Sequence, residues 1–417
     1  MKIIVIGGGA AGFFGAITCA SHPHTEVTIL EAGREFLTKV RISGGGRCNV
    51  THHCFDPSGL VQSYPRGGKA LRGAFTKFNP ENTVTWFTRR GVKLKTEADG
   101  RMFPITDDSE TIVRCLLQGA EKTGVRLIPN TPVQKVDKEG DKFIISLKNG
   151  GNMECDRVLL ATGSNPLGYR IARSLGHTII TPIPSLFTFQ IQDSRLKDLA
   201  GVSVSKASLT LSDTGKEKLQ QTGPLLITHW GISGPAVLKL SAWAAPVLHQ
   251  NNYRMTITVN WLTDYNAEKI RQILLHNKTS QAKRKISNYC PFDLPKRLWQ
   301  SLLIHVGIDS ETIWTQLSKN QCNGLIQELN AGQYQIKGKG VFKEEFVTCG
   351  GVDLKEIDFR TMESKCCPGL HFAGEVLDID GVTGGFNFQS AWTTGYLAGE
   401  AMRKPLPSRD PAEIKTY

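Results

Sequence analysis

Apolar runs and helical patterns alternate through the N-terminal part of the chain. The apolar run Ile3–Ile6 is followed by glycines and by a helical pattern over 13–20, and a second apolar run covers 27–30. A helical pattern at 109–123 then precedes another apolar run, Val158–Ala161. Strands that alternate with helices are typical of an α/β fold, so we expect one here.

A different pattern occupies the middle of the chain. Apolar and polar residues alternate from Thr188 to Leu211, as in an antiparallel sheet. Helical patterns follow at 266–276, 294–305 and 310–329. The tail returns to the first style, with an apolar strand at 370–373 and a helix over 386–402. We therefore expect 190–345 to be inserted into a first domain that is built from both ends of the chain.

Turn residues add three local predictions. The segment 33–80 carries several glycine, proline and asparagine turn signals and is predicted to be a long loop-rich segment. Ser233 is predicted to cap a helix that has Pro235 in its first turn. In the tail, a glycine turn at Gly381–Gly385 is predicted to lead into the last helix.

The glycines after the first strand follow the pattern of a dinucleotide-binding turn. Gly7, Gly9 and Gly12 have the spacing G-x-G-x-x-G. The first glycine permits the tight turn, the second lets the backbone approach a pyrophosphate, and the third lets the next helix pack closely on the sheet. Glu31 ends the second strand, where a carboxylate accepts hydrogen bonds from the ribose of an adenosine. The sequence therefore predicts a bound dinucleotide.

Size and cysteine content narrow the class of protein. The 417 residues suit two or three domains, and no apolar run approaches the roughly 20 residues that cross a bilayer. The ten cysteines are scattered and form no C-x-x-C pair, which favours a reducing compartment over a disulfide framework. We expect a cytoplasmic protein with no membrane segment and no metal site.

Positive charge is concentrated in one stretch of the chain. The net charge is +12, and residues 34–95 carry twelve basic side chains against three acidic ones. Such a stretch favours an anionic partner, which could be nucleic acid, a phosphorylated substrate or only the cofactor. A basic surface that only contacts solvent is an equally good interpretation of the charge count.

The identity of the dinucleotide follows from the other glycine turns. Only one G-x-G-x-x-G fingerprint is present, so one dinucleotide is expected to bind tightly and any second one transiently. Thr162–Gly163 forms a second turn, and the turn before Phe386 points the start of a helix at a ligand. A reduced isoalloxazine carries negative charge at its N1–C2=O edge, which such a helix start would stabilise. These turns together predict FAD.

Several longer motifs resemble the BaiN/YhiN-like family of FAD-dependent oxidoreductases over almost the whole chain. The most specific are Ile42-Ser-Gly-Gly-Gly-Arg-Cys-Asn49 and Phe372-Ala-Gly-Glu-Val-Leu-Asp-Ile-Asp-Gly381. Thr228-His-Trp-Gly-Ile-Ser-Gly-Pro235, Cys349-Gly-Gly-Val-Asp353 and Thr383-Gly-Gly-Phe-Asn-Phe-Gln389 accompany them. The resemblance implies a Rossmann-like FAD-binding domain, 1–189 plus 346–417. It also implies an inserted β-rich, barrel-like domain, 190–262 plus 331–345, which carries a small helical domain, 263–330.

The resemblance also implies the residues that would hold FAD. These are Gly7, Gly9, Ala10, Ala11, Gly12, Glu31, Ala32, Arg41, Ser43, Gly44, Gly45, Arg47, Cys48, Asn49, Val133, Thr162, Gly163, Gly374, Glu375, Gly384, Gly385, Phe386 and Asn387. One departure concerns the segment after Gly163, which reaches Tyr169-Arg-Ile-Ala172 with fewer polar residues than is usual in the family. That segment normally flanks the flavin, so its shortening affects the expected substrate contacts.

Three residues are candidates for catalysis. His229 could donate or accept a proton, or it could be a histidine whose hydrogen bonds are satisfied within a turn. Cys48 could donate a proton, although a packed structural thiol is the favoured interpretation. Arg47 could polarise a substrate carbonyl, but neutralising the pyrophosphate is the favoured role. The expected activity is hydride transfer from NAD(P)H through flavin N5 to a conjugated C=C, with uracil in ribosomal RNA as one substrate. The alternatives are a small-molecule oxidase that uses an amine and O₂, and a non-catalytic flavin-binding sensor.

Overall fold

The chain folds into two compact units. The computed structural model describes residues 1–404 apart from 213–214, 216–217 and 341–346. The first unit contains Met1–Pro182 and the chain from Thr348 onwards, and the second contains Ile183–Val347. The structure thus joins both ends of the chain in one unit. The predicted three-domain boundaries stay a prediction, and the one between 345 and 346 lies outside the described residues.

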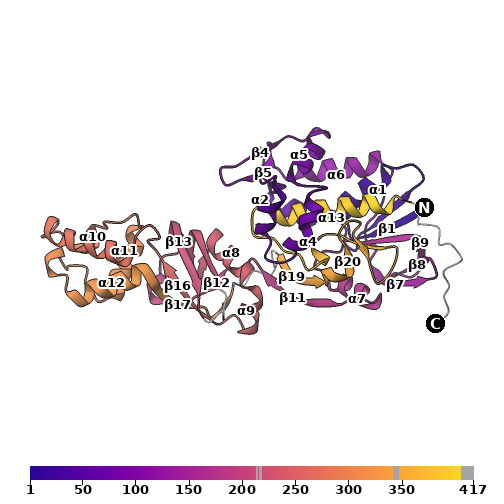
Figure 1. Cartoon of the computed structure of the whole chain (residues 1–417). Coiled ribbons are helices and arrows are strands. Elements are labelled where there is room, and N and C mark those ends of the chain that lie inside the picture. Colours follow the sequence, from indigo (N-terminus) through magenta and orange to yellow (C-terminus); the bar gives the residue numbers. More distant parts are fainter. Residues whose placement is uncertain (213–214, 216–217, 341–346, 405–417) are drawn as a thin grey trace. The chain divides into compact units, whose positions relative to one another are not determined.

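A mostly parallel sheet forms the centre of the first unit (Figure 1). Its strand order is β20-β21-β22-β10-β1-β2-β6. The parallel strands are β1 (Lys2–Ile6), β2 (Glu26–Leu30), β6 (Arg126–Ile128), β10 (Arg157–Leu160) and β22 (Leu370–Phe372). The short strands β20 (Ile357–Asp358) and β21 (Glu363–Ser364) pair antiparallel at one edge. This α/β, Rossmann-type arrangement is the predicted fold class.

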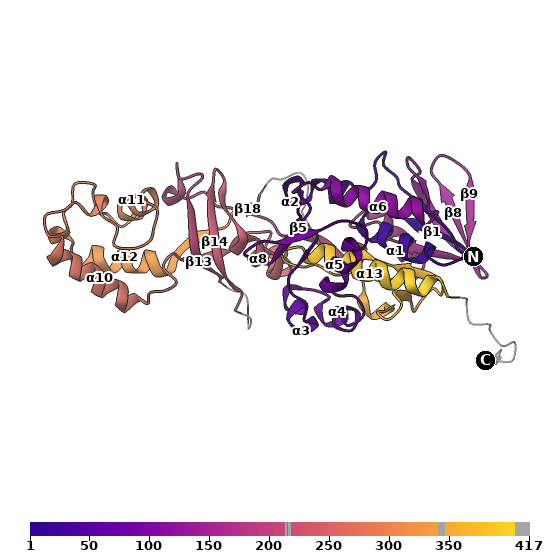
Figure 2. The same ribbon diagram turned by 90° about the horizontal axis from the view of Figure 1, so that it is seen from above.

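Two glycine-rich helices pack against each other beside this sheet (Figure 2). They are α1 (Ala10–Ala20) and α13 (Phe386–Met402). A Cβ atom on Gly395 would lie 2.6 Å from the Ala11 carbonyl oxygen, and one on Gly399 would lie 2.5 Å from the Gly15 carbonyl oxygen. Only glycine permits these approaches, so the small residues of α13 hold the C-terminal helix on the N-terminal one.

The remaining elements of the first unit surround this core. The helices are α2 (Thr38–Gly46), α3 (Pro57–Leu60), α4 (Gly68–Phe75), α5 (Pro80–Thr88), α6 (Glu110–Lys122) and α7 (Pro166–Ser174). One small antiparallel sheet contains β3 (Thr51–His52), β4 (Leu94–Thr96) and β5 (Arg101–Pro104). Another contains β7 (Val133–Glu139), β8 (Lys142–Leu147) and β9 (Asn152–Cys155). The strands β11 (Ile179–Ser185) and β19 (Val347–Val352) pair as a two-stranded sheet at the two places where the chain passes between the units.

The second unit is built on an antiparallel sheet. Its strand order is β17-β16-β13-β14-β15-β12-β18. In chain order the strands are β12 (Phe189–Gln190), β13 (Ser203–Leu211), β14 (Gln220–Thr228), β15 (Gly231–Ser233), β16 (Thr256–Asn260), β17 (Gly332–Gln335) and β18 (Gly338–Lys339). The helices are α8 (Pro235–Trp243), α9 (Ala245–Gln250), α10 (Ala267–Ser280), α11 (Lys296–His305) and α12 (Lys319–Ala331). One hydrophobic core runs from the sheet residue Leu209 to the helical residues Trp299 and Leu329.

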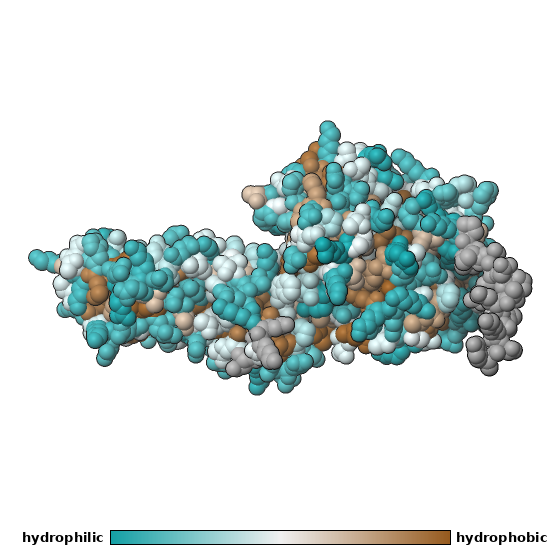
Figure 3. Space-filling view, viewed as in Figure 1, coloured by the Kyte–Doolittle hydropathy of each residue, from teal (hydrophilic) through white to brown (hydrophobic). Residues whose placement is uncertain are grey.

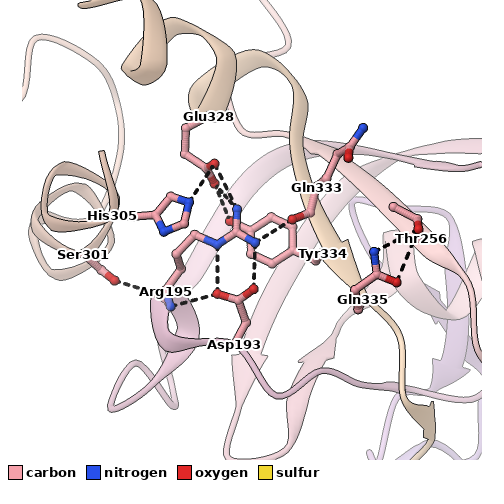
Figure 4. A network of polar contacts seen from close by, with 9 residues as sticks. All are labelled: Asp193, Arg195, Thr256, Ser301, His305, Glu328, Gln333, Tyr334 and Gln335. Atoms are coloured by element: carbon pink, nitrogen blue, oxygen red, sulfur yellow. Dashed lines mark hydrogen bonds and ion pairs between the residues drawn. The ribbon is translucent and has the colours of Figure 1, made fainter. Parts of the chain in front are cut away.

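A buried ionic cluster joins the sheet of the second unit to its helices (Figure 4). Arg195 lies at its centre and is only 6% exposed. Its guanidinium donates to the carboxylates of Asp193 at 2.7 Å and Glu328 at 2.8 Å, and lies 3.7 Å from the centre of the Tyr334 ring. Tyr334 in turn donates to Glu328 at 3.0 Å. The buried charges are therefore all paired, as burial of charge requires.

Three local predictions need correction. The segment 33–80 is less loop-rich than predicted, because it contains α2, α3, α4 and the strand β3. Ser233 does not cap α8: Gly234 occupies the cap with a φ of 99°, and no side chain caps the helix. The helix expected over 310–329 begins only at Lys319, because Ser318 accepts a hydrogen bond from the Gln321 N–H and caps it there.

Among the described residues, no helix combines the length and the apolar character that a membrane span requires. Hydrophilic residues cover most of the face of each unit that Figure 3 shows. Nearly all the predicted site residues lie in the first unit, so the candidate functional site is sought there.

Candidate functional site

The first glycine turn lies between β1 and α1. Gly7 has a φ of +112°, and a Cβ atom there would lie 2.4 Å from the Ala161 carbonyl oxygen. A Cβ on Gly12 would lie 2.0 Å from the Gly7 carbonyl oxygen. At Gly9, by contrast, a Cβ would have no atom within 4 Å. Gly7 and Gly12 are thus required by the fold, whereas Gly9 borders open space.

The start of α1 faces this space without a side-chain cap. Gly9 is the cap residue, and no side chain accepts a hydrogen bond from the first turn. The N–H groups of Ala10 and Ala11 therefore begin a helix whose N-terminus carries partial positive charge. Such an end binds a phosphate without any cationic side chain.

Glu31 lies next to the same turn. Its carboxylate accepts the Gly8 N–H and the Gly33 N–H, each at 2.8 Å. The backbone carbonyl of Glu31 accepts the Thr131 N–H at 2.8 Å, which brings the start of β7 and the buried Val133 to this edge. Two oxygens oriented by backbone donors keep lone pairs that can accept ribose hydroxyls. Ala32 follows Glu31 and is exposed.

The non-helical end of α2 and the residues that follow it form a loop that contributes backbone to the site. Gly44 and Gly45 have φ of 58° and 68°, so they interrupt the helix, and a Cβ on Gly45 would meet nothing within 4 Å. Ser43 donates to the Val40 carbonyl at 2.9 Å and accepts the Cys48 N–H on its own carbonyl at 3.0 Å. This turn therefore presents an open glycine surface supported by internal hydrogen bonds.

The two arginines of this loop are already paired with acids. Arg41 donates to Glu110, and Arg47 donates to Glu97 at 2.7 Å while its guanidinium lies 4.0 Å from the centre of the Phe103 ring. The Glu97 interaction raises the pKa of Arg47 further. In addition, the buried Arg41 Nε has no hydrogen-bond partner among the residues that the structure describes. The Nε of Arg157 and the indole nitrogens of Trp261 and Trp314 lack partners in the same way, so this atom does not by itself identify a ligand site.

Cys48 is packed inside the loop. The side chain is fully buried, and its backbone adopts a left-handed conformation with a φ of 59°. Burial raises the pKa of the Cys48 thiol to about 12. The thiol therefore stays protonated at neutral pH, which fits a structural role.

The turn after β10 and the turn after β22 meet. The Thr162 side chain packs against Gly168, where an added Cβ would lie 1.9 Å from its hydroxyl oxygen, so only the backbone of Thr162 is left for the turn. Gly163, with a φ of +59°, lies beside Glu375. Glu375 accepts the Thr348 N–H at 3.0 Å and the Lys39 ammonium at 2.7 Å. Gly374 adjoins Ala11, since its Cβ position lies 2.9 Å from the Ala11 Cβ.

The start of α13 completes the arrangement. Gly384 and Gly385 have φ of +139° and +91°, and no side chain caps the helix that begins at Phe386. Asn49 joins this turn to the second loop. With its amide oriented so that both groups are satisfied, its side-chain oxygen accepts the Gly385 N–H at 2.9 Å and its nitrogen donates to the Thr51 carbonyl at 3.0 Å. Asn387 exchanges two hydrogen bonds with the backbone of Gly381 and holds the turn closed.

Two residues beside α13 are absent from the predicted site. The His52 ring stacks on the Phe386 ring with centres 4.6 Å apart, and its Nδ1 lies 3.0 Å from the Gly384 carbonyl oxygen. The buried Tyr64 donates its hydroxyl to the Phe386 carbonyl at 2.7 Å. More than 300 residues of sequence separate each from its partner, so no local pattern reveals them.

His229 lies in the other unit. It occupies the turn between β14 and β15, is exposed, and forms no hydrogen bond or ion pair within the described part of the chain. The remaining predicted residues lie together in the first unit, around the carboxyl ends of β1, β2 and β10 and the start of α13. Their roles stay predictions.

One cluster outside this site has the composition of a metal site. Ligand atoms of His177, Glu356 and Cys366 lie within 4.8 Å of one another. Both ring nitrogens of His177 are engaged, Nδ1 with Glu356 at 2.9 Å and Nε2 with the Ser364 hydroxyl at 2.8 Å. The burial of His177 also lowers its pKa. We assign no metal to this cluster, because the hydrogen bonds already account for its groups.

Comparison with known proteins gives matches over almost the whole chain. The family model described as "HI0933-like protein Rossmann domain" matches residues 1–401. A ribosomal RNA dihydrouridine synthase of Haemophilus influenzae is 31% identical over 408 residues, covering 94% of this chain and 96% of the relative. A 3-dehydro-bile acid delta(4,6)-reductase of Clostridium scindens is 29% identical over 410 residues, covering 96% and 98%. Among solved structures, a 3-ketosteroid-delta4-(5alpha)-dehydrogenase of Rhodococcus jostii has a TM-score of 0.50 at 14% identity, with 97% of each chain covered.

Proposed function

The chain belongs to the HI0933-like family, and from that premise we propose that it reduces a conjugated C=C bond with electrons from NAD(P)H, its substrate being uracil in ribosomal RNA. The coarser prediction, an FAD-dependent oxidoreductase with a Rossmann-type fold, is confirmed by the family and by the flavoenzyme relatives. The substrate, the reductant and the site residues are proposals. The ribosomal RNA substrate would place the protein in the cytoplasm.

The observation that supports a bound flavin is the open backbone of the first unit, which we call the cradle. Gly9 and Gly45 border free space, and the starts of α1 and α13 have no side-chain cap. Backbone N–H groups and helix N-termini suit an anionic dinucleotide better than a neutral ligand. The residues present therefore fit FAD.

Each part of the cradle has a distinct role in this proposal. The start of α1 and the backbone of Gly9 would hold the pyrophosphate, and Glu31 would accept hydrogen bonds from the adenosine ribose. The start of α13 would face the pyrimidine edge of the flavin, where negative charge collects on reduction. Bound FAD would supply a hydride acceptor and donor at N5, so that NAD(P)H, a proton and the C=C bond yield NAD(P)⁺ and the saturated bond.

The protein must also deliver the proton. Cys48 is fully buried in its loop, which removes it from contact with a macromolecular substrate. His229, the other predicted proton donor, is exposed and belongs to the second unit, so its role stays a prediction. Arg47, already paired with Glu97, would support the loop beside the pyrophosphate.

The basic stretch 34–95 separates into two groups in the structure, and this supports the RNA substrate. Five of its cations form ion pairs: Lys39, Arg41, Arg47, Arg66 and Lys95. Apart from Arg34, the cations that form no ion pair among the described residues lie on or after α4 and α5. They are Lys69, Arg72, Lys77, Arg89, Arg90 and Lys93, and all are exposed.

The two helices that carry this surface pack on α13 (Figure 2). In this proposal the unpaired cations would contact RNA phosphates while the target base reaches the flavin. The Arg90 guanidinium also lies 3.7 Å from the centre of the Trp86 ring, and such a planar pair suits stacking on a base. The RNA proposal therefore rests on placed charges as well as on the names of the relatives.

The experiment combines purified protein, FAD, NADH or NADPH, and ribosomal RNA from cells that lack the gene. Mass spectrometry of the RNA should show a uridine that gains the mass of two hydrogen atoms. Unchanged RNA beside a flavin that NAD(P)H bleaches would remove the RNA substrate and leave a small-molecule reductase. Peroxide release with an amine would favour the oxidase, and a flavin that neither nucleotide bleaches would favour the sensor.

A further inference from the structure

The turn that leads into α13 is held by side chains from a segment near the other end of the chain. Tyr64 donates to the Phe386 carbonyl, Asn49 accepts the Gly385 N–H, and His52 contacts the Gly384 carbonyl. Arg66 forms an ion pair with the fully buried Asp380, which precedes the turn. The first three contacts thus fix different backbone groups of 384–386, and the fourth fixes the Asp380 side chain.

The chemistry of each contact defines which group donates. A carbonyl oxygen only accepts, so His52 carries its ring hydrogen on Nδ1 when it bonds Gly384. The same peptide group of Gly384 and Gly385 presents its N–H to Asn49. This peptide is therefore held at both of its polar atoms and cannot rotate without breaking a hydrogen bond.

Tyr64 contacts another peptide group, at the start of α13. The Phe386 carbonyl and the Asn387 N–H belong to one peptide group, and that N–H lies in the first turn of α13, where no side chain caps it. A hydrogen bond to the carbonyl polarises the peptide and strengthens its N–H as a donor. The Tyr64 hydroxyl is buried, so water does not replace the bond.

We propose that Tyr64 is a positioning residue that raises the reduction potential of the bound flavin through the Phe386–Asn387 peptide. The inference rests on the proposed function, since it requires the flavin pyrimidine to lie at the start of α13. Reduction adds negative charge at that edge, and a better aligned and more polarised N–H favours the reduced flavin over the oxidised one. Tyr64 would thus act on the cofactor without touching it.

The variant Tyr64→Phe tests this directly. It removes the hydroxyl and keeps the ring that packs on Phe75. Tyr396→Phe is the matched control, because Tyr396 lies on α13, stacks on Phe78 and forms no hydrogen bond through its hydroxyl in the described residues. Dye-coupled titration of the FAD-loaded proteins measures the reduction potential without any substrate.

Loss of the Tyr64 bond should reduce the preference for reduced over oxidised flavin about three- to tenfold, which is a potential about 15 to 30 mV more negative. Tyr396→Phe should keep the wild-type potential. Equal potentials for the wild type and both variants would overturn the inference while leaving the proposed function intact. A wild-type protein that binds no FAD would instead overturn the proposed function.

A second pair of variants covers a Tyr64→Phe protein that fails to fold. His52→Asn places an amide N–H where the ring Nδ1–H stands, whereas His52→Leu offers no donor to the Gly384 carbonyl. The potential should stay near the wild-type value in the first and become more negative in the second. Wild-type potentials in both would overturn the positioning of this turn by the 49–66 segment.

Discussion

Replacing Gly9 by alanine separates the fold of the first glycine turn from its proposed ligand. The Gly9 backbone has φ of −92° and ψ of −169°, which alanine adopts without strain, and its Cβ would have no atom within 4 Å. Gly12→Ala is the matched control, because its Cβ would lie 2.0 Å from the Gly7 carbonyl oxygen. The first change should affect FAD binding alone, and the second should affect the fold.

The expected magnitudes follow from these contacts. At Gly9, alanine is a poorer helix cap than glycine. Alanine also restricts the unfolded chain, which stabilises the folded protein by about 0.4–1 kcal/mol. The two effects oppose each other, so the stability of the apoprotein should change by less than about 1 kcal/mol. The methyl group would hold the pyrophosphate away from the backbone and cost one charge-assisted hydrogen bond, about 1.5–3 kcal/mol. The FAD dissociation constant should therefore rise about 10- to 150-fold.

At Gly12 the balance is reversed. Alanine in the interior of a helix normally adds about 1 kcal/mol of stability, but here the overlap with Gly7 should cost about 3 kcal/mol or more. Thermal unfolding of the two apoproteins and fluorescence titration with FAD measure both quantities. Wild-type FAD affinity in Gly9→Ala would refute the cradle at this turn, and wild-type stability in Gly12→Ala would refute the packing argument.

Three further predictions concern other parts of the chain. Arg195→Met leaves a buried carboxylate unpaired, so calorimetry should show that the free energy of unfolding falls by about 3–5 kcal/mol. Because Arg195 lowers the Asp193 pKa, the wild type should also lose stability as the pH falls below about 4. A variant with the same loss of stability in acid would contradict this. Cys48→Ser should keep FAD and leave the rate of flavin reduction unchanged between about pH 6 and 9, because burial raises the Cys48 pKa to about 12. A changed pH profile of that rate would show that the thiol takes part in proton transfer. The double variant Lys69→Glu, Arg72→Glu should weaken RNA binding and leave the FAD content unchanged. The slope of log K against log salt concentration should become shallower by about one unit per lost phosphate contact. An unaltered slope would exclude this surface as the RNA-binding surface.

The sequence predicts most where glycine or apolar patterning decides the structure locally. The last helix was expected over 386–402 and is α13 with those bounds, because a glycine turn begins it and small residues mark its packed face. The start of α12 was misplaced although Ser318 and Gln321 form a capping box that the sequence displays. Of the short helices within 33–80, α4 packs against α13 and α2 packs against α6, and no local pattern encodes these distant partners.

The predicted site shows the same division between local and long-range causes. Glycines are recognisable because their backbone conformations exclude other residues, and the open space at Gly9 and Gly45 lies at glycines that the motifs identify. The role of a basic residue cannot be predicted in this way, because the acid that pairs with it is distant in the sequence. Glu110 lies 69 residues beyond Arg41, and Glu97 lies 50 residues beyond Arg47. Since those acids neutralise the two arginines, the phosphates of a bound dinucleotide must be matched mainly by backbone N–H groups and helix N-termini. Recognition of the cofactor then depends on positions that have no side chain, which explains why a glycine pattern identifies the ligand class while the basic residues beside it do not.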